Sequence, residues 1–183
     1  QQAAARALLG EEDGDGAVRG AELSHPVCAL ELPSGEVVVS ESATSQLQLL
    51  AADGSRLRSL GERGRAQSDL HTPRGLACDG ELLYIADSQN GRVQRRRLAD
   101  LGVALPDVEL PPDEAGEAPL RRPEALVLCD GTLYVCDKVG CKVHTLSLPA
   151  LEYRGAFGSR GSGPAELCDP GGMAVLARAP AAP

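Results

Sequence analysis

A chain of 183 residues can form one domain with a buried core but not two large domains. Its formal net charge of -8 at pH 7 argues against a nucleic-acid or anionic-membrane surface spread over the whole molecule. Aromatic residues make up only 2% and Trp is absent, so the core must be built from aliphatic side chains and Cys.

The order of apolar residues excludes a membrane-spanning helix, because no run approaches the ~18 residues that such a helix needs. The opening stretch, QQAAARALLGEEDGDG, has neither the basic start nor the apolar centre of a signal peptide. The cysteines form no CxxC pair, and only Cys136 and Cys141 lie close in sequence. We therefore expect unpaired, mostly buried thiols and a cytoplasmic location, without contact to a membrane.

A segment of similar pattern occurs repeatedly along the chain, and each copy begins at a proline. The spacings are 47, 50 and 47 residues between Pro26, Pro73, Pro123 and Pro170. In the first three copies the proline is followed by a short apolar strand, a turn that contains Gly, and a second apolar strand. An acidic residue closes the second strand each time, and these acids are Glu41, Asp87 and Asp137.

The strands expected in each unit can be placed by their turns. The first strands cover residues 27–32, 75–78 and 125–129, and the second strands read EVVVS, LLYIA and TLYVC. Asp79-Gly80 and Asp130-Gly131 separate two of these pairs, and Asp-Gly between apolar runs predicts a β-hairpin. A further strand follows in each unit, with the sequences SQLQLL, GRVQRRRL and CKVHTLSL. The second strands are apolar on both faces, so we expect neighbouring layers to cover them on both sides.

The linkers between units repeat as well. LGERGRAQSDLHTP and FGSRGSGPAELCDP align without a gap, which places Gly61 and Gly64 opposite Gly158 and Gly161. The predicted units are residues 24–70, 71–120 and 121–167. Residues 1–23 read as the tail of a preceding unit and its linker, and residues 168–183 read as the first strand of a further unit.

Roughly four short strands per unit of this length predict an all-β protein, with each unit forming one blade of a β-propeller. Helical solenoids are excluded because no window keeps a 3.6-residue period. The lack of Trp argues against WD and kelch blades, and the only Gly-Gly pair is Gly171-Gly172.

The motif PRGLACDGELLYIADSQNGRV (73–93) and the linker FGSRGSG (157–163) resemble the NHL-repeat family. The third unit departs from the family pattern at Gly140 and Lys142, and the first unit departs at Glu41, Thr44 and Gln46. The resemblance implies a propeller, commonly of six blades, that acts as a rigid platform for partners. Its best-known members are ubiquitin-ligase scaffolds; some members bind RNA, and related propellers are enzymes with a metal in the central channel.

About three blades with partial flanking blades form an open arc or part of a ring of about six, because propellers need at least four blades to close. An open arc exposes the apolar flanks of its terminal blades. We expect a longer parent protein; otherwise copies of the chain would self-associate to complete the ring.

Residues that recur in every unit are expected to be structural, since a catalytic group usually occurs once. Asp87 is expected to accept backbone N–H groups of the following turn, with Asn90 in that turn and Arg92 returning toward the acid, as Lys142 would toward Asp137. The full structural set is Pro26, Glu41, Pro73, Asp87, Asn90, Arg92, Pro123, Asp137, Lys142 and Pro170.

The sequence predicts no catalytic residue, no metal site and no cofactor. His25, His71 and His144 are scattered, and a channel site built from the first two with Asp169 would meet Arg122 in the third unit. No nucleophile elbow, Walker loop or HExxH motif occurs, and GSRGSG (158–163) lacks the Lys-Ser/Thr of a phosphate loop.

Arginines concentrate in the second unit and its junctions, where RVQRRR stands out in an acidic chain. Strand alternation places Arg95 and Arg97 on one face and Arg96 on the other. These charges either belong to a solvent-exposed outer strand or bind a partner, which would be an acidic protein or RNA. The shortage of aromatic residues disfavours RNA. The candidate partner-binding residues are Arg74, Arg92, Arg95, Arg96, Arg97, Arg121 and Arg122.

The function expected from the sequence is a non-enzymatic protein-interaction scaffold, as the substrate-recognition part of a ubiquitin-ligase-type protein. An RNA-binding NHL propeller and a metal-dependent propeller hydrolase or lyase are the alternatives.

Overall fold

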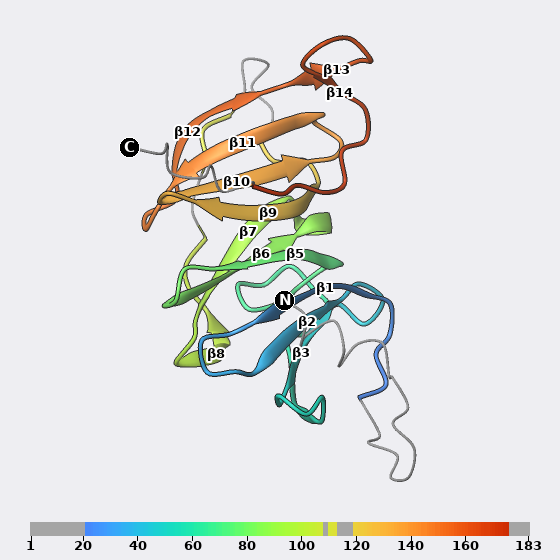
Figure 1. Cartoon of the computed structure of the whole chain (residues 1–183), viewed down its shortest axis with the longest axis vertical. Helices are drawn as coiled ribbons and strands as arrows, with labels where there is room; N and C mark the ends of the chain where they lie inside the picture. The colour runs from blue at the N-terminus through green and yellow to red at the C-terminus, as the bar shows by residue number, and fades with distance from the viewer. Residues whose placement is uncertain (1–20, 108–109, 113–118, 176–183) are drawn as a thin grey trace, which may run out of the picture.

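Three four-stranded antiparallel sheets make up the fold in a computed structural model, which describes residues 21–107, 110–112 and 119–175 (Figure 1). The parts of the terminal units within residues 1–20 and 176–183 lie outside the described residues. No α-helix occurs in the described part, so none there could span a bilayer. The prediction of an all-β fold is confirmed.

Each sheet pairs its strands in chain order. The first contains β1 (Pro26–Glu31), β2 (Val37–Glu41), β3 (Gln46–Leu50) and β4 (Arg56–Leu60). The second contains β5 (Pro73–Cys78), β6 (Leu82–Asp87), β7 (Arg92–Arg97) and β8 (Asp100–Ala104), with the 3-10 turn η1 (Ser88–Asn90) between β6 and β7. The third contains β9 (Pro123–Cys129), β10 (Thr132–Asp137), β11 (Lys142–Ser147) and β12 (Glu152–Phe157). Such up-and-down sheets are the unit of a propeller blade.

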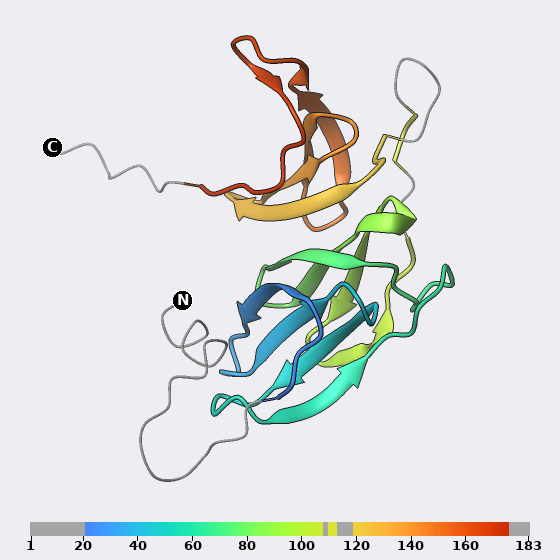
Figure 2. The same cartoon turned by 90° about the vertical axis from the view of Figure 1, so that its right-hand side faces the viewer.

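The sheets stack as a fan, with β1, β5 and β9 side by side along its inner side (Figure 2). Side chains on the middle sheet alternate between its two neighbours, as a strand period of two requires. Leu83 and Ile85 pack into a core cluster with the first sheet, whereas Tyr84 and Ala86 pack into a cluster with the third. All of β6 is buried, so the expectation of a strand covered on both faces is confirmed.

The innermost strands approach each other closely because their contact positions carry small residues. A Cβ added to Gly75 of β5 would lie 2.8 Å from the Cα of Ala125 in β9. Real Cβ atoms do not tolerate such a distance, so a side chain there would push the second and third blades apart. The aligned positions in the other two units hold Cys28 and Ala125, which are also small.

The two linkers that align in sequence form the same loop. Gly61 and Gly158 begin them with φ of +87° and +90°, a conformation that glycine adopts without steric cost. Arg63 forms a parallel bridge with Leu70, and the equivalent pairing joins β13 (Ser159–Arg160) to β14 (Glu166–Leu167). The linkers therefore belong to the repeat and fix the spacing between blades.

No strand occurs over residues 168–175, the described part of the segment 168–183 that was expected to hold the first strand of a further unit. An innermost strand is held by hydrogen bonds to the second strand of its own sheet, and no such second strand occurs among the described residues. The segment instead lies along the outer face of the third sheet. There Met173 and Val175 line a hollow with Tyr134 and Phe157.

Candidate binding edge

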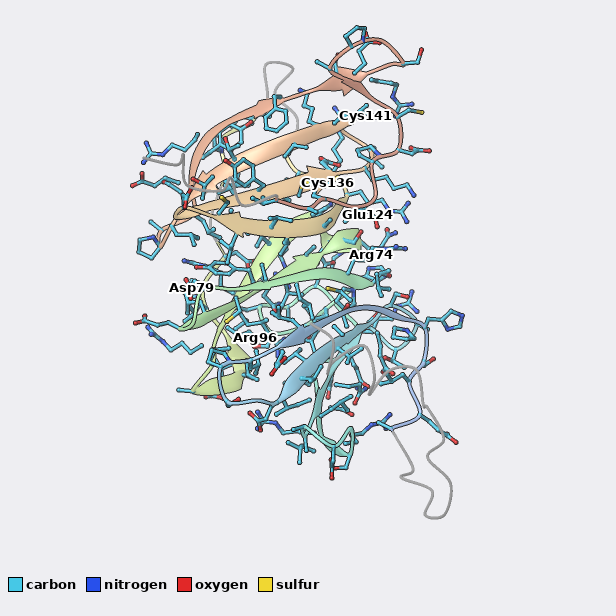
Figure 3. The ribbon with its side chains drawn as sticks, in the orientation of Figure 1. Arg74, Asp79, Arg96, Glu124, Cys136 and Cys141 are labelled. Carbon is cyan, nitrogen blue, oxygen red and sulfur yellow. The ribbon has the colours of Figure 1, made fainter. Side chains whose placement is uncertain are left out.

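The fan has two ends that differ in chemistry. We call the end where β1, β5 and β9 begin the proline edge, after Pro26, Pro73 and Pro123. The acids that close β2, β6 and β10 lie at the same end, because each pairs across the sheet with its proline. The opposite end, called the turn edge, contains the first hairpin turns. Figure 3 shows the two ends, with Arg74 and Glu124 on the right at the proline edge and Asp79 on the left at the turn edge.

The recurring acids tie the start of each blade to the end of its second strand. Glu41, Asp87 and Asp137 are buried, with 2%, 0% and 0% of their surface exposed. Each accepts a backbone N–H just upstream of the proline, and the donors are Ser24 (2.6 Å), His71 (2.7 Å), and both Arg121 (2.8 Å) and Arg122 (3.0 Å). This arrangement supports a structural role. The bond from a backbone N–H of the following turn was expected at Asp87 and is not among its hydrogen bonds with the described residues; Asp137 accepts such a bond, from the N–H of Gly140 at 2.9 Å.

The side chains that donate hydrogen bonds to the recurring acid differ between blades. Glu41 accepts hydrogen bonds from Thr44 (2.8 Å) and Gln48 (2.7 Å). Asp87 accepts from Nε of Arg92 (2.8 Å), as the sequence predicted, and also from Asn90 (2.8 Å), for which only a place in the turn was predicted.

Lys142 does not form the predicted ion pair with Asp137. Three backbone N–H groups already bind the oxygen atoms of Asp137, and the imidazole of His144 lies 3.7 Å from Oδ2. His144 occupies the position of Gln48 in the first blade and is itself buried. The buried imidazole of His144 thus lies beside Asp137, where the side chain of Lys142 was expected.

These contacts make Asp137 a source of pH dependence. Burial by itself would raise its pKa, but the nearby imidazole of His144, 3.7 Å from Oδ2, and the hydrogen bonds from the N–H groups of Arg121, Gly140 and Arg122 outweigh burial and lower the pKa to about 2. The stabilisation is therefore complete above the pKa of the unfolded chain, near the ordinary 3.8, and is lost as the pH falls through about 2.

We expect Asp137→Asn to be less stable than the wild type at pH 7 by on the order of 2 kcal/mol and to lose less stability on acidification. Urea unfolding followed by circular dichroism from pH 6 to pH 3 measures both quantities. Parallel stability curves for the two proteins would contradict the assignment.

Arg96 is not part of a surface patch, which corrects its place among the candidate partner-binding residues. Its side chain is fully buried and faces the first blade. Its guanidinium donates to Oε1 of Gln94 (2.8 Å) and to the carbonyl groups of Leu101 (2.7 Å) and Ser68 (2.9 Å). Burial lowers its pKa to about 10, so the side chain stays charged at neutral pH. The neighbouring linker, which the sequence did not place against β7, supplies the carbonyl group of Ser68.

Arg92 and Arg95 are also engaged within the chain. Arg92 binds Asp87 and Asp107 and donates to the carbonyl groups of Ala66 and Asp69. Arg95 donates to the carbonyl group of Pro106 at 3.0 Å.

Arg97, in contrast, is exposed and lies at the turn edge, opposite Leu82. The predicted arginines therefore form several separate groups rather than one patch.

Three of the predicted arginines meet at the proline edge, at the seam between the second and third blades. Nη1 of Arg74 lies 3.0 Å from Oε2 of Glu124, and Nε of Arg122 lies 3.0 Å from Oε1. Arg121, the neighbour of Arg122, is exposed. Glu124 was not predicted from the sequence, because a single acid beside a blade proline gives no signal until the neighbouring blade brings Arg74 to it. Other exposed or half-exposed basic residues on this edge are Arg63, Arg65, Lys138 and Arg160.

Histidine and cysteine side chains do not converge in the described part of the chain. No three His, Cys, Asp or Glu residues lie together there in a metal-binding group. His71 contacts Arg63 (3.4 Å), and His144 lies against Tyr153. The six cysteines are unpaired as expected, but only Cys136 and Cys141 are buried and Cys168 is exposed, which corrects the expectation of mostly buried thiols. Burial, with Asp137 and Glu124 nearby, raises the pKa of Cys136 to about 11, which makes this thiol a poor nucleophile.

Comparison with known proteins supports the architecture. No protein-family model matches the chain, and no curated protein is significantly similar to it. Virginiamycin B lyase from Staphylococcus aureus has a similar structure, with a TM-score of 0.56 and 18% identity over 73% of this chain and 41% of the lyase. A chain of a nidogen/laminin complex gives a TM-score of 0.57 and 20% identity over 75% of this chain and 48% of its own length. The fold is that of a β-propeller.

The propeller likeness extends to other proteins at equally low identity. Glutaminyl cyclase from Myxococcus xanthus matches with a TM-score of 0.55 and 16% identity over 75% of this chain and 52% of the cyclase. The chain thus spans about half or less of these propeller proteins. Their functions differ from one another, so the likeness carries the fold alone.

Proposed function

We propose that this propeller segment is a non-enzymatic protein-interaction module whose proline edge binds an acidic segment of a partner protein. The observation that carries the proposal is that the recurring acidic side chains on this edge are buried, whereas several basic side chains are exposed. The side chains of Arg63 and Arg65 are exposed, and Arg121 is exposed as well. A partner that reaches this edge meets exposed guanidinium groups, which can bind carboxylates, beside exposed acids such as Glu62.

Two further parts of the proposal rest on the repeat. The NHL-like motif at residues 73–93 supports membership of that family, and with it a role as the substrate-recognition part of a ubiquitin-ligase-type protein in the cytoplasm. A propeller in a nidogen/laminin complex shows that this fold serves protein recognition elsewhere. A lyase is also among the structural neighbours, but the described residues of this chain offer no metal-binding group that would favour that chemistry here.

Acidic protein is preferred to RNA because, among the described residues, Phe157 at the proline end of β12 is the only Phe or Tyr side chain that is exposed. Single-stranded RNA is usually held by aromatic side chains on which its bases stack. Tyr84 is buried in the core, and Phe157, which is 57% exposed, belongs to the outer face of the third blade. Exposed guanidinium groups with so few exposed aromatic side chains suit carboxylates better than bases.

Fluorescence anisotropy with a labelled peptide of ten glutamates tests the proposal. We expect the whole chain to bind this peptide and the affinity to fall as salt screens the charges. Reversal of Arg63, Arg65 and Arg121 to Glu should weaken binding by about tenfold or more. The matched control reverses Arg56, Arg58 and Arg154, which are exposed on β4 and β12.

Failure of the wild-type chain to bind, or equal losses in the two reversed variants, would overturn the proposal. Tighter binding of a ten-uridine RNA through the same edge would favour the RNA alternative instead.

A further inference from the structure

We infer that Arg74 and Arg122 form a binding site for one carboxylate group, positioned by the buried Glu124. The inference rests on the proposed function and names the group that the proline edge recognises. The ligand is an Asp or Glu side chain, or a C-terminal carboxylate, of an acidic peptide segment.

The two arginines come from different blades and share one internal carboxylate. The Glu124 side chain is only 4% exposed, and each of its oxygen atoms lies 3.0 Å from a nitrogen of one arginine. The close packing of β5 against β9 at Gly75 brings Arg74 to Glu124. The site therefore exists only where two blades meet, and it is assembled by the packing of their innermost strands.

The backbone on both sides of the site is also held in place. The carbonyl group of Arg74 accepts a hydrogen bond from Ser40 Oγ at 2.6 Å. The N–H of Arg122 donates to Asp137 (3.0 Å), and its carbonyl group accepts from the N–H of Lys138 (3.0 Å). Arginine side chains that start from a fixed backbone and end on a fixed carboxylate lose little further freedom on binding.

The two guanidinium groups have more hydrogen-bond donors than the carboxylate of Glu124 can accept. Each guanidinium has five N–H donors, and one carboxylate offers about four acceptor positions. The Nε atoms of Arg74 and Arg122 and Oε1 of Glu124 are buried without an aligned hydrogen bond.

The two arginine side chains are 28% and 33% exposed, and because their Nε atoms are buried, a ligand can be reached only by their Nη groups. Two cations around one anion leave a local charge of +1, which a single added carboxylate neutralises. Such a carboxylate can accept the paired N–H groups that a guanidinium presents.

The labelled ten-glutamate peptide serves again as the probe, with variants that remove charge without reversing it. We expect Arg74→Gln and Arg122→Gln each to weaken binding by about threefold to tenfold, and the double variant by more than tenfold. The matched control is the double variant Arg97→Gln with Arg154→Gln, which removes the same charge from exposed positions away from the proline edge. We expect this control to bind within twofold of the wild type.

Two further variants separate a built site from a general excess of positive charge. Arg74→Lys with Arg122→Lys keeps the charge but removes the planar pair of donors, so it should still weaken binding severalfold. Glu124→Gln adds positive charge to the edge but removes the group that aligns both arginines, and we expect it to bind more weakly. Tighter binding by Glu124→Gln would show that only the local net charge matters, and it would overturn the assignment.

The result with the wild-type chain distinguishes the two proposals. If it does not bind the peptide, the proposed function fails and this inference with it. If it binds, and the Arg74→Gln, Arg122→Gln double variant binds equally well while reversal of Arg63, Arg65 and Arg121 abolishes binding, the edge is correct and this site is wrong. Circular dichroism melting curves show whether each variant is folded, and the lysine variants replace any glutamine variant that is not.

Discussion

Replacing Asp87 by Ala is expected to lower the free energy of unfolding by about 3–5 kcal/mol, because it breaks a buried charged pair by removing one partner. The carboxylate accepts hydrogen bonds from the N–H of His71, from Asn90 and from Arg92, all within 2.8 Å. Without it, these donors are left at the buried junction between β6 and the start of β5.

Urea unfolding followed by circular dichroism gives the change directly, since the chain has no Trp for fluorescence. Asp87→Asn keeps the shape and one acceptor, so its loss should be smaller. Glu81→Ala, an exposed acid in the same blade, should change stability by less than about 0.5 kcal/mol and serves as the control. A cost below about 1 kcal/mol for Asp87→Ala would show that the recurring acids do not hold the blades together.

Replacing Arg96 by Ala is expected to lower the free energy of unfolding by about 3 kcal/mol. The guanidinium donates hydrogen bonds to two carbonyl groups and to Gln94, and a bond from a charged group contributes roughly 1.5–3 kcal/mol. The release of a buried charge offsets part of this loss, whereas the cavity left by the side chain adds to it.

Arg96→Leu is the informative partner variant, because Leu50 and Leu146 occupy the equivalent positions in the other two blades. It should retain more stability than Arg96→Ala, since the aliphatic volume remains. Arg97→Ala removes an exposed arginine from the next position and should change stability by less than about 0.5 kcal/mol. If Arg96→Ala and Arg97→Ala cost the same, Arg96 does not anchor the linker.

The structure also bears on which predicted residues can meet a partner. The arginines of β7 are adjacent in sequence but have three different environments. Arg95 bonds to the loop that follows β8, Arg96 is buried against the first blade, and Arg97 is exposed at the turn edge. Alternation along the strand predicted that Arg96 would differ from its neighbours. Alternation did not predict that the linker containing Ser68 would cover the face of β7 on which Arg96 lies.

The repeat, the all-β class, the hairpin turns and the positions of the recurring acids were determined by the sequence alone. These features depend on local chemistry: apolar residues with a strand period, Asp-Gly turns, and a proline and an acid that recur at fixed spacing. The bond from Arg92 to Asp87 belongs to this group, because both residues lie in one hairpin.

Only the tertiary structure decided the burial of Arg96, the pairing of Asp137 with His144 in place of Lys142, and the meeting of Arg74 and Arg122 at Glu124. The first and the third depend on which segment packs against a strand from outside its own hairpin, whereas His144 lies in the same hairpin as Asp137 and reaches it from a position two residues beyond Lys142. Strand periodicity tells which side chains share a face, but the environment of that face is set by the neighbouring blade. The candidate site lies where two blades meet, and for that physical reason the sequence of either blade by itself does not contain it.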